Sequence, residues 1–348
     1  MDMTRAGVRE MAALVARLGE QLRSSYAIAC GHDVVIPTDA DRVVVFGMGG
    51  SAAAAEVVGG SLAAGTFDLR IVRTYAPPFP LRDRDLLVFS SYSGNTEETL
   101  SSFEAVLEGE HADRAVALGS GGRLAELAEA ADVPVLPIPG GLPPRASLGH
   151  GVGLLCGILQ RAGMVGDLTA QVEEAAGRLD DGVRRHGLDG DAPGDDSVSG
   201  WAERLSGRLP VVYAGAPVAI ASMRRLRAQL NENSKMLVST AELPELDHNE
   251  IVGWGHATSV RSEAVVVALR DPGEHPRVAR RFEITREVLA DRVAHWGEVS
   301  VQDGAPLARC LESVQWGDAL SVALASHHEV DPMPVSAIDT LKDRLGRP

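Results

Sequence analysis

The sequence predicts an α/β protein made of two doubly wound parallel sheets with flanking helices, in the flavodoxin-like arrangement. Short runs of β-branched and apolar residues alternate with helical patterns, which is typical of βαβ units. This alternation occurs in both halves of the chain, and a polar segment separates the halves. The chain has 348 residues, more than the roughly 250 to 300 at which a single core usually stops growing. Two domains are therefore expected.

The first half is expected to form five strands with helices between them. The strands are predicted at 42–47, 69–75, 85–91, 114–120 and 133–139. Helical patterns cover 51–64, 95–108 and 122–131, and two more helices are predicted at 147–163 and 169–185. Strands that alternate with helices in this way favour a parallel sheet covered on both faces.

The second half repeats this architecture without an obvious repeat of the sequence. Strands are predicted at 209–215, 264–269 and 297–302, again with helices between them. The segment 186–200 is rich in Gly, Asp and Ser and is the best candidate linker. We therefore predict an N-terminal domain at 1–187 and a C-terminal domain at 201–348.

Composition limits the classes of function. The formal net charge of −15 argues against general binding to nucleic-acid phosphates, which an acidic surface repels. Cys30, Cys156 and Cys310 are scattered, so neither a disulfide framework nor a cysteine metal site is predicted, and a reducing, cytoplasmic setting fits. No secretion signal is expected, because the N-terminal stretch is a charged amphipathic pattern. No membrane span is expected either, because polar residues, Gly or Pro interrupt each apolar segment before roughly 18 positions.

A glycine-rich loop follows the first predicted strand, in the stretch "VVVFGMGGSAAAAEVV" at 43–58. Gly47, Gly49 and Ala52 satisfy the spacing of a dinucleotide-binding turn. That interpretation needs an acidic residue at the end of the next strand to hold a ribose, and "LRIVRTY" has none, although Arg73 could serve a 2′-phosphate. Ser51 directly after the glycines suits a compact phosphate monoester better.

A second loop, "SSYSGNTEETL" at 90–100, places hydroxyl groups before another predicted helix. Unpaired backbone N–H groups at a helix N-terminus bind anions, and hydroxyls add further donors. The alternative is that Asn95 or Thr96 only caps the helix, with Glu98 completing a capping box. The density of hydroxyls and the recurrence of a Gly-Ser loop after another strand favour ligand binding.

Six stretches in order carry a family resemblance: "GMGGSA" (47–52), "SYSGNTEET" (91–99), "PPRASLG" (143–149), "QLNENSKM" (229–236), "ELDHNEIVGW" (245–254) and "AIDTLKDRL" (337–345). With them the chain resembles the sugar isomerase (SIS) superfamily and, within it, the bifunctional phosphoglucose/phosphomannose isomerases. The resemblance implies two SIS domains and metal-independent aldose-ketose isomerisation of hexose 6-phosphates through a cis-enediolate. It also implies a homodimer, no cofactor and no bound metal. The implied phosphosugar-binding residues are Gly49, Gly50, Ser51, Ser91, Ser93 and Thr96.

The resemblance also implies four catalytic residues. Glu232 would be the base that moves a proton between C2 and C1, and His248, supplied by the neighbouring subunit, would assist ring opening. Lys342 would join in ring opening, and Arg145 would face the enediolate oxygen, where a fixed positive charge stabilises the developing negative charge. Without the resemblance, Glu232 and Lys342 would be interpreted as solvated helix residues, with Lys342 paired to Asp339. His248 would be interpreted as a buried structural histidine or as a metal ligand.

Other functions remain as alternatives. SIS domains also occur in regulators that bind sugar phosphates without converting them, and an isomerase of another phosphosugar has similar loops. "HHEVDP" at 327–332 offers possible metal ligands, but it lacks the H-E-x-x-H spacing of a zinc site.

Overall fold

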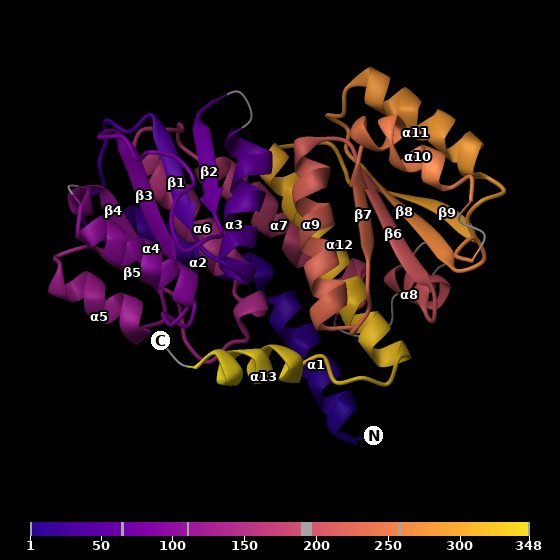
Figure 1. Ribbon diagram of the computed structural model, residues 1–348, viewed down its shortest axis with the longest axis horizontal. Coiled ribbons are helices and arrows are strands. Elements are labelled where there is room, and N and C mark those ends of the chain that lie inside the picture. Colours follow the sequence, from indigo (N-terminus) through magenta and orange to yellow (C-terminus); the bar gives the residue numbers. More distant parts are fainter. Residues whose placement is uncertain (1, 64–65, 110, 189–196, 257–258, 347–348) are drawn as a thin grey trace. The chain divides into compact units, whose positions relative to one another are not determined.

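The computed structural model describes residues 2–63, 66–109, 111–188, 197–256 and 259–346 (Figure 1). They form two compact units. One unit holds residues 17–177 and 336–348, and we call it the first-sheet unit; the other holds 1–16 and 178–335 and is called the second-sheet unit.

The first-sheet unit contains the five expected strands. They are β1 (Arg42–Phe46), β2 (Asp68–Val72), β3 (Asp85–Ser90), β4 (Ala115–Gly119) and β5 (Val135–Pro137). All neighbouring pairs are parallel, in the order β2-β1-β3-β4-β5. This is the flavodoxin-like order, in which the chain reverses its direction of winding between β1 and β3. The predicted fold class is confirmed.

The same unit contains six whole α-helices among the described residues. They are α2 (Leu18–Gly31), α3 (Gly49–Val58) with the π-helical turn η1 (Gly59–Ala63), α4 (Glu97–Leu107), α5 (Gly122–Ala130), α6 (Leu148–Arg161) and α13 (Ser336–Leu345), with short 3-10 turns η2 (Ala112–Arg114) and η3 (Pro144–Ala146). Helices α4 and α5 pack on one face through a buried apolar cluster. Its centre is aromatic: the rings of Phe46 and Phe89 stack at 4.4 Å, and Phe103 of α4 meets Phe89 edge-on.

The second-sheet unit has four parallel strands in the order β7-β6-β8-β9. They are β6 (Leu209–Ala214), β7 (Ser239–Glu242), β8 (Ala264–Arg270) and β9 (His295–Ser300). The order matches that of the first sheet without its fifth strand. The predicted strands β6, β8 and β9 are confirmed, whereas β7 was not expected, because "STAE" is short and polar and lies at the edge of the sheet.

The helices of this unit are divided between the two faces of its sheet. They are α1 (Asp2–Ala16), α8 (Val198–Leu205), α9 (Pro217–Glu232), α10 (Glu250–Gly253), α11 (Pro276–Leu289) and α12 (Pro306–His327), with the 3-10 turn η4 (Glu245–His248); α7 (Thr169–Arg185) enters the unit at Arg178. Helices α8, α9 and α12 pack on one face. Leu246 of η4, Trp254 and Phe282 of α11 pack on the other. Figure 1 shows the two helix layers on either side of the strands.

These units differ from the expected domains 1–187 and 201–348 at both ends of the chain. The N-terminal helix α1 belongs with the second sheet, where it packs against α12. A Cβ atom on Gly7 would lie 2.1 Å from the Asp331 carboxylate, so glycine permits this close approach. The C-terminal helix α13 belongs with the first sheet. Of the predicted linker 186–200, residues 189–196 lie outside the described residues, and α8 begins at Val198.

A buried histidine makes the stability of the first-sheet unit depend on pH. His150 of α6 is 7% exposed, with Nδ1 2.8 Å from Ser25 Oγ, and burial, reinforced by the charge of Arg17, lowers its pKa to about 4. In the unfolded chain the pKa of a histidine is about 6.5, so the unfolded state binds more protons. The stability contribution is therefore present above about pH 6.5 and is lost as the pH falls towards 4.

We expect the free energy of unfolding, measured by urea titration at pH 7.5 and pH 5, to fall less between these pH values in His150→Gln than in the wild type. The same pH dependence in both proteins would contradict the assignment. His186 in the second-sheet unit, whose pKa burial also lowers to about 4, accounts for part of the fall that remains in the variant.

Candidate functional site

The glycine-rich loop joins β1 to α3 at the carboxyl edge of the first sheet, and it lies against the turn that carries Arg145. A Cβ atom on Gly50 would sit 2.7 Å from the carbonyl oxygen of Pro144 and 3.6 Å from the Cα of Arg145. A Cβ atom on Gly47 would sit 2.9 Å from the carbonyl oxygen of Ser90. Only glycine allows these approaches, which draw three segments far apart in the sequence to one edge of the sheet.

The hydroxyl-rich loop joins β3 to α4 at the same edge. Ser91 Oγ and Thr96 Oγ1 lie 2.9 Å apart, and Ser93 Oγ accepts a hydrogen bond from the Asn95 backbone N–H at 3.2 Å. Gly94 adopts a left-handed φ of 69°, and a Cβ there would meet the carbonyl oxygen of Gly121 at 1.8 Å. The loop is therefore closely packed against the neighbouring loop after β4.

The capping interpretation of this loop is wrong. The residue that precedes α4 is Thr96, and its side chain makes no capping hydrogen bond. Asn95 Oδ1 accepts instead from the Arg123 backbone N–H, at 3.0 Å, at the start of α5. Met48, which precedes α3, also provides no side-chain cap. Among the described side chains none caps α3 or α4, so both helix N-termini keep backbone donors that suit an anion.

A tyrosine joins the hydroxyl-rich loop to the segment that leads to Arg145. The Tyr92 hydroxyl donates to the carbonyl oxygen of Pro139 at 3.0 Å and accepts from the Leu142 backbone N–H at 2.7 Å. Arg145 itself is 4% exposed, in η3. All the predicted phosphosugar-binding residues and Arg145 therefore lie on loops that meet at one edge of the first sheet.

Glu232 is the last residue of α9 in the second-sheet unit, and buried polar contacts with α12 fix that end of the helix. Asn233 Nδ2 donates to Ser321 Oγ at 3.0 Å, and Ser234 Oγ donates to the carbonyl oxygen of Ser321 at 2.7 Å. Two turns earlier, Arg225 makes a two-pronged ion pair with Asp318 at 2.8 and 3.0 Å. A carboxylate at this position is held on rigid elements and half-buried.

His248 lies on the other side of the same sheet. It ends η4, which follows the carboxyl end of β7, and it is exposed. Glu232 lies before the amino end of β7, on the face covered by α9 and α12, whereas the neighbours of His248 pack with α11 on the opposite face. The sheet separates the two side chains, so one copy of this unit does not bring them into one pocket.

Lys342 lies in the last turn of α13, an exposed helix of the first-sheet unit. It therefore lies in the same compact unit as Arg145 and the glycine-rich and hydroxyl-rich loops, whereas Glu232 and His248 lie in the other unit.

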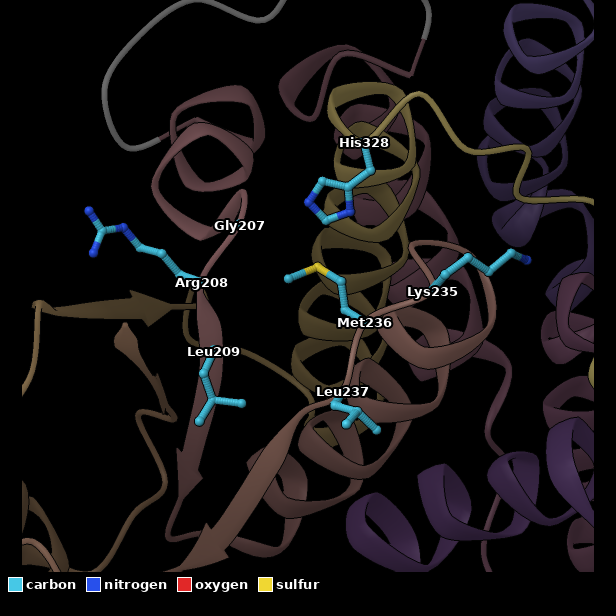
Figure 2. A pocket seen from close by; sticks show the side chains of 7 residues that line it. All are labelled: Gly207, Arg208, Leu209, Lys235, Met236, Leu237 and His328. Atoms are coloured by element: carbon cyan, nitrogen blue, oxygen red, sulfur yellow. The ribbon is translucent and has the colours of Figure 1, made fainter. Parts of the chain in front are cut away.

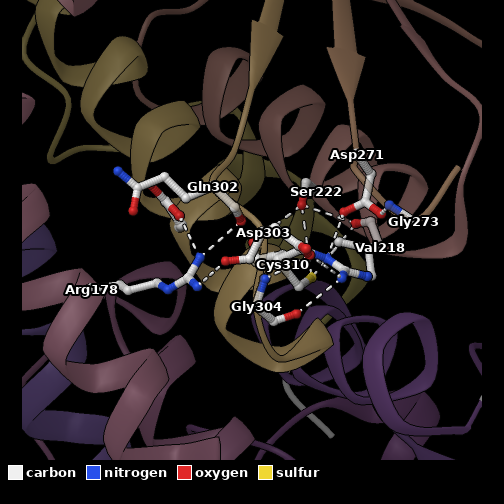
Figure 3. Close-up of polar contacts among 11 residues, drawn as sticks. Arg178, Val218, Ser222, Asp271, Gly273, Gln302, Asp303, Gly304 and Cys310 are labelled. Atoms are coloured by element: carbon white, nitrogen blue, oxygen red, sulfur yellow. Dashed lines mark hydrogen bonds and ion pairs between the residues drawn. The ribbon is translucent and has the colours of Figure 1, made fainter.

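At the corresponding edge of the second sheet, protein groups occupy the loop after β8 (Figure 3). Asp271 follows β8, as Ser91 follows β3, and it is 4% exposed. Its carboxylate accepts from the Gly273 backbone N–H at 2.8 Å and from Arg309 Nε at 3.1 Å. A buried carboxylate therefore already holds the donors of the loop after β8.

A shallow pocket of about 380 Å³ lies at the amino edge of the second sheet (Figure 2). It is lined by Gly207, Arg208, Leu209, Lys235, Met236, Leu237 and His328. The charged groups of Arg208 and Lys235 bind the carbonyl oxygens of Ser262, Glu232 and Pro334, and Figure 2 shows the two side chains extending to opposite sides. The remaining lining is mainly apolar, which does not suit a phosphate.

Among the described residues, no three His, Cys, Asp or Glu side chains gather closely enough to hold a metal ion. In the "HHEVDP" stretch, Asp331 instead accepts the Met333 backbone N–H at 2.9 Å. None of the described helices combines the length and apolar character needed to cross a bilayer.

Solved structures share the two-sheet fold. A hypothetical protein from Thermus thermophilus superimposes with a TM-score of 0.69 at 17% identity, covering 99% of this chain and 95% of that one. A putative phosphosugar isomerase from Clostridium difficile 630 has a TM-score of 0.66 at 13% identity, covering 96% and 98%. The fold defines the class as an α/β protein with two parallel, doubly wound sheets.

Residues 196–345 match the family model for the bacterial phospho-glucose isomerase C-terminal SIS domain. The chain is 32% identical to the bifunctional phosphoglucose/phosphomannose isomerase of Caldicellulosiruptor bescii, over 95% of this chain and 97% of that protein. It is 34% identical to the protein of that name from Aquifex aeolicus, over 87% and 90%. The chain belongs to the bifunctional phosphoglucose/phosphomannose isomerase family.

Proposed function

We propose that this protein interconverts glucose 6-phosphate and mannose 6-phosphate with fructose 6-phosphate. The observation that carries the proposal is the match to relatives of that name over nearly their whole length. The loops at the carboxyl edge of the first sheet support it, because they present two uncapped helix N-termini and several hydroxyls to a small anion.

In this proposal the loops of the first sheet bind the phosphosugar. Gly49, Gly50 and Ser51 at the start of α3 and the hydroxyls of the β3–α4 loop donate hydrogen bonds to it. The loop after β8 in the second sheet has no part in this proposal, because its carboxylate, Asp271, is already paired with Arg309.

The proposed chemistry uses protein groups alone. After ring opening, Glu232 removes the proton from C2, an enediolate forms across C1 and C2, and the same carboxyl group returns the proton to C1. A proton moves from the C2 hydroxyl to the C1 oxygen. Arg145 stabilises the enediolate charge. Glucose and mannose 6-phosphates differ only at C2, so both reach the same intermediate, and one base serves both. Lys342 and His248 exchange protons with the ring oxygen and the C1 hydroxyl during ring opening.

The placement of His248 supports a homodimer with shared active sites. Within one copy the second sheet separates His248 from Glu232, yet a single hexose must meet both groups in the proposed reaction. A second copy supplies His248 from its exposed surface, which is the simplest closed symmetric arrangement.

The proposed reaction is tested by incubating each aldose 6-phosphate with the protein in deuterium oxide, with and without a chelator. Formation of fructose 6-phosphate with deuterium entering at the exchanged carbon, unchanged by the chelator, is expected. Binding of fructose 6-phosphate without conversion would indicate a sensor instead and overturn the proposal, and loss of activity with the chelator would overturn its metal-independent mechanism.

The hydroxyl-rich loop makes a separate prediction about affinity. Ser91→Ala is expected to raise KM about 10-fold with a smaller change in kcat, because a hydrogen bond to a charged group contributes about 1.5–3 kcal/mol. Steady-state kinetics measures this. Ser101→Ala is the matched control: Ser101 of α4 donates through its Oγ to the carbonyl oxygen of Tyr75, so the KM of this variant should be unchanged. An unchanged KM in Ser91→Ala would remove this residue from the site.

A further inference from the structure

The short segment that carries His248 is fastened on both sides. On one side, the Asp247 carboxylate accepts from Arg281 Nη1 and from Thr285 Oγ1, each at 2.8 Å, and both donors lie on α11. On the other side, Glu250 Oε1 accepts from the Tyr213 hydroxyl at 2.6 Å. His248 itself is exposed between these two anchors.

Tyr213 is the anchor that ties the segment to the core. It lies on β6, its side chain is fully buried, and its hydroxyl also accepts from Trp254 Nε1 at 3.1 Å. Burial, with the hydrogen bond to Glu250, raises the pKa of the Tyr213 phenol. The phenol therefore stays protonated and keeps donating to Glu250 throughout the working pH range.

A turn on an exposed surface would otherwise move. The 3-10 turn η4 has four residues and the helix α10 has four, so neither is stable by its own hydrogen bonds. The contacts at positions 247, 250 and 254 hold this stretch to β6 and α11. A displacement of about 1 Å of a catalytic group can cost roughly 100-fold in rate.

We propose that Tyr213 and Glu250 are positioning residues for His248: a buried phenol–carboxylate hydrogen bond sets where the imidazole is presented. The inference rests on the proposed role of His248 in ring opening. It goes beyond that role, because it assigns a function to two residues that do not touch the substrate.

Tyr213→Phe removes the hydroxyl and keeps the ring. We expect kcat to fall about 10- to 100-fold with KM nearly unchanged, because the phosphate loops belong to the other unit. Tyr26→Phe is the matched control: its hydroxyl donates to Gln160 Oε1 at 2.7 Å and lies 3.2 Å from Thr169 Oγ1, so kcat should stay at the wild-type value. Glu250→Gln keeps an acceptor oxygen and should retain more activity than Glu250→Ala.

The decisive measurement is a double-mutant cycle with His248→Ala. If Tyr213 acts through His248, the Tyr213→Phe effect on kcat disappears in the His248→Ala background, whereas a purely structural effect persists there. Should Tyr213→Phe fail to fold, the Glu250→Ala and Glu250→Gln pair enters the same cycle.

The two proposals fail separately. Wild-type kcat in His248→Ala would overturn the role of His248 and this inference with it. A large loss in His248→Ala, with wild-type kcat in Tyr213→Phe or with additive losses, would overturn the positioning role alone.

Discussion

Glu232→Gln is expected to lower kcat by about 10³-fold, because a glutamine cannot take the C2 proton and a positioned general base contributes roughly 10²- to 10⁴-fold. The substitution keeps the size of the side chain. Asn233 and Ser234, which fix the end of α9 on α12, are untouched. Binding of fructose 6-phosphate, measured by calorimetry, should therefore stay close to that of the wild type.

Glu203→Gln, at an exposed position of α8 in the same unit, is the matched control and should retain full activity. Near-wild-type turnover in Glu232→Gln would remove Glu232 from the mechanism. Loss of both turnover and binding would show that the residue supports the site's structure instead of the proton transfer.

The second large effect concerns which copy supplies His248. Co-expressing Glu232→Gln and His248→Ala chains with different affinity tags yields dimers that hold one of each. If His248 acts across the interface, one of the two sites in such a dimer combines an intact Glu232 with an intact His248. The mixed dimer should then show about half the wild-type kcat per dimer, although each variant alone is nearly inactive.

The matched control pairs a wild-type chain with a chain that carries both substitutions. In the shared-site arrangement each site of this dimer lacks one group, so activity should be close to that of the single variants. Half activity in this control, with none in the first mixed dimer, would place Glu232 and His248 of the same chain in one site. A monomer in sedimentation analysis would also contradict the shared site.

The architecture of the sheets could be read from the sequence because its signals are local. A parallel strand buried on both faces needs a run of apolar residues, as in "RVVVF" and "AVVVAL", and the helix that follows shows its own period. Strand β7 was not predicted, because a strand at the edge of a sheet needs fewer apolar residues. Its residues, Ser239–Glu242, are all exposed or half-buried.

The positions of the glycine-rich and hydroxyl-rich loops were also predictable, since a glycine or hydroxyl directly after a strand is a local pattern; their binding of a phosphate stays a prediction. The four proposed catalytic residues were different. Nothing in the local pattern of Glu232, His248 or Lys342 distinguishes them from surface residues. They were identified as candidates only through a resemblance across the whole chain.

Contacts between residues far apart in the sequence needed the tertiary structure. Asp271 and Arg309 are 38 positions apart, and Tyr213 and Glu250 are 37 apart. No periodicity connects such pairs, because hydrogen bonds between distant side chains depend on how strands and helices pack. The ion pair after β8 and the anchor of the His248 segment are therefore results of the fold.

By itself the sequence determined the α/β class, the two parallel sheets and the two loops suited to a phosphate, because each is encoded by residues adjacent along the chain. Only the tertiary structure decided that α1 joins the second sheet and α13 the first, and that Glu232 and His248 lie on opposite faces of one sheet. Those outcomes depend on contacts between segments far apart in the sequence, which form only once the chain has folded.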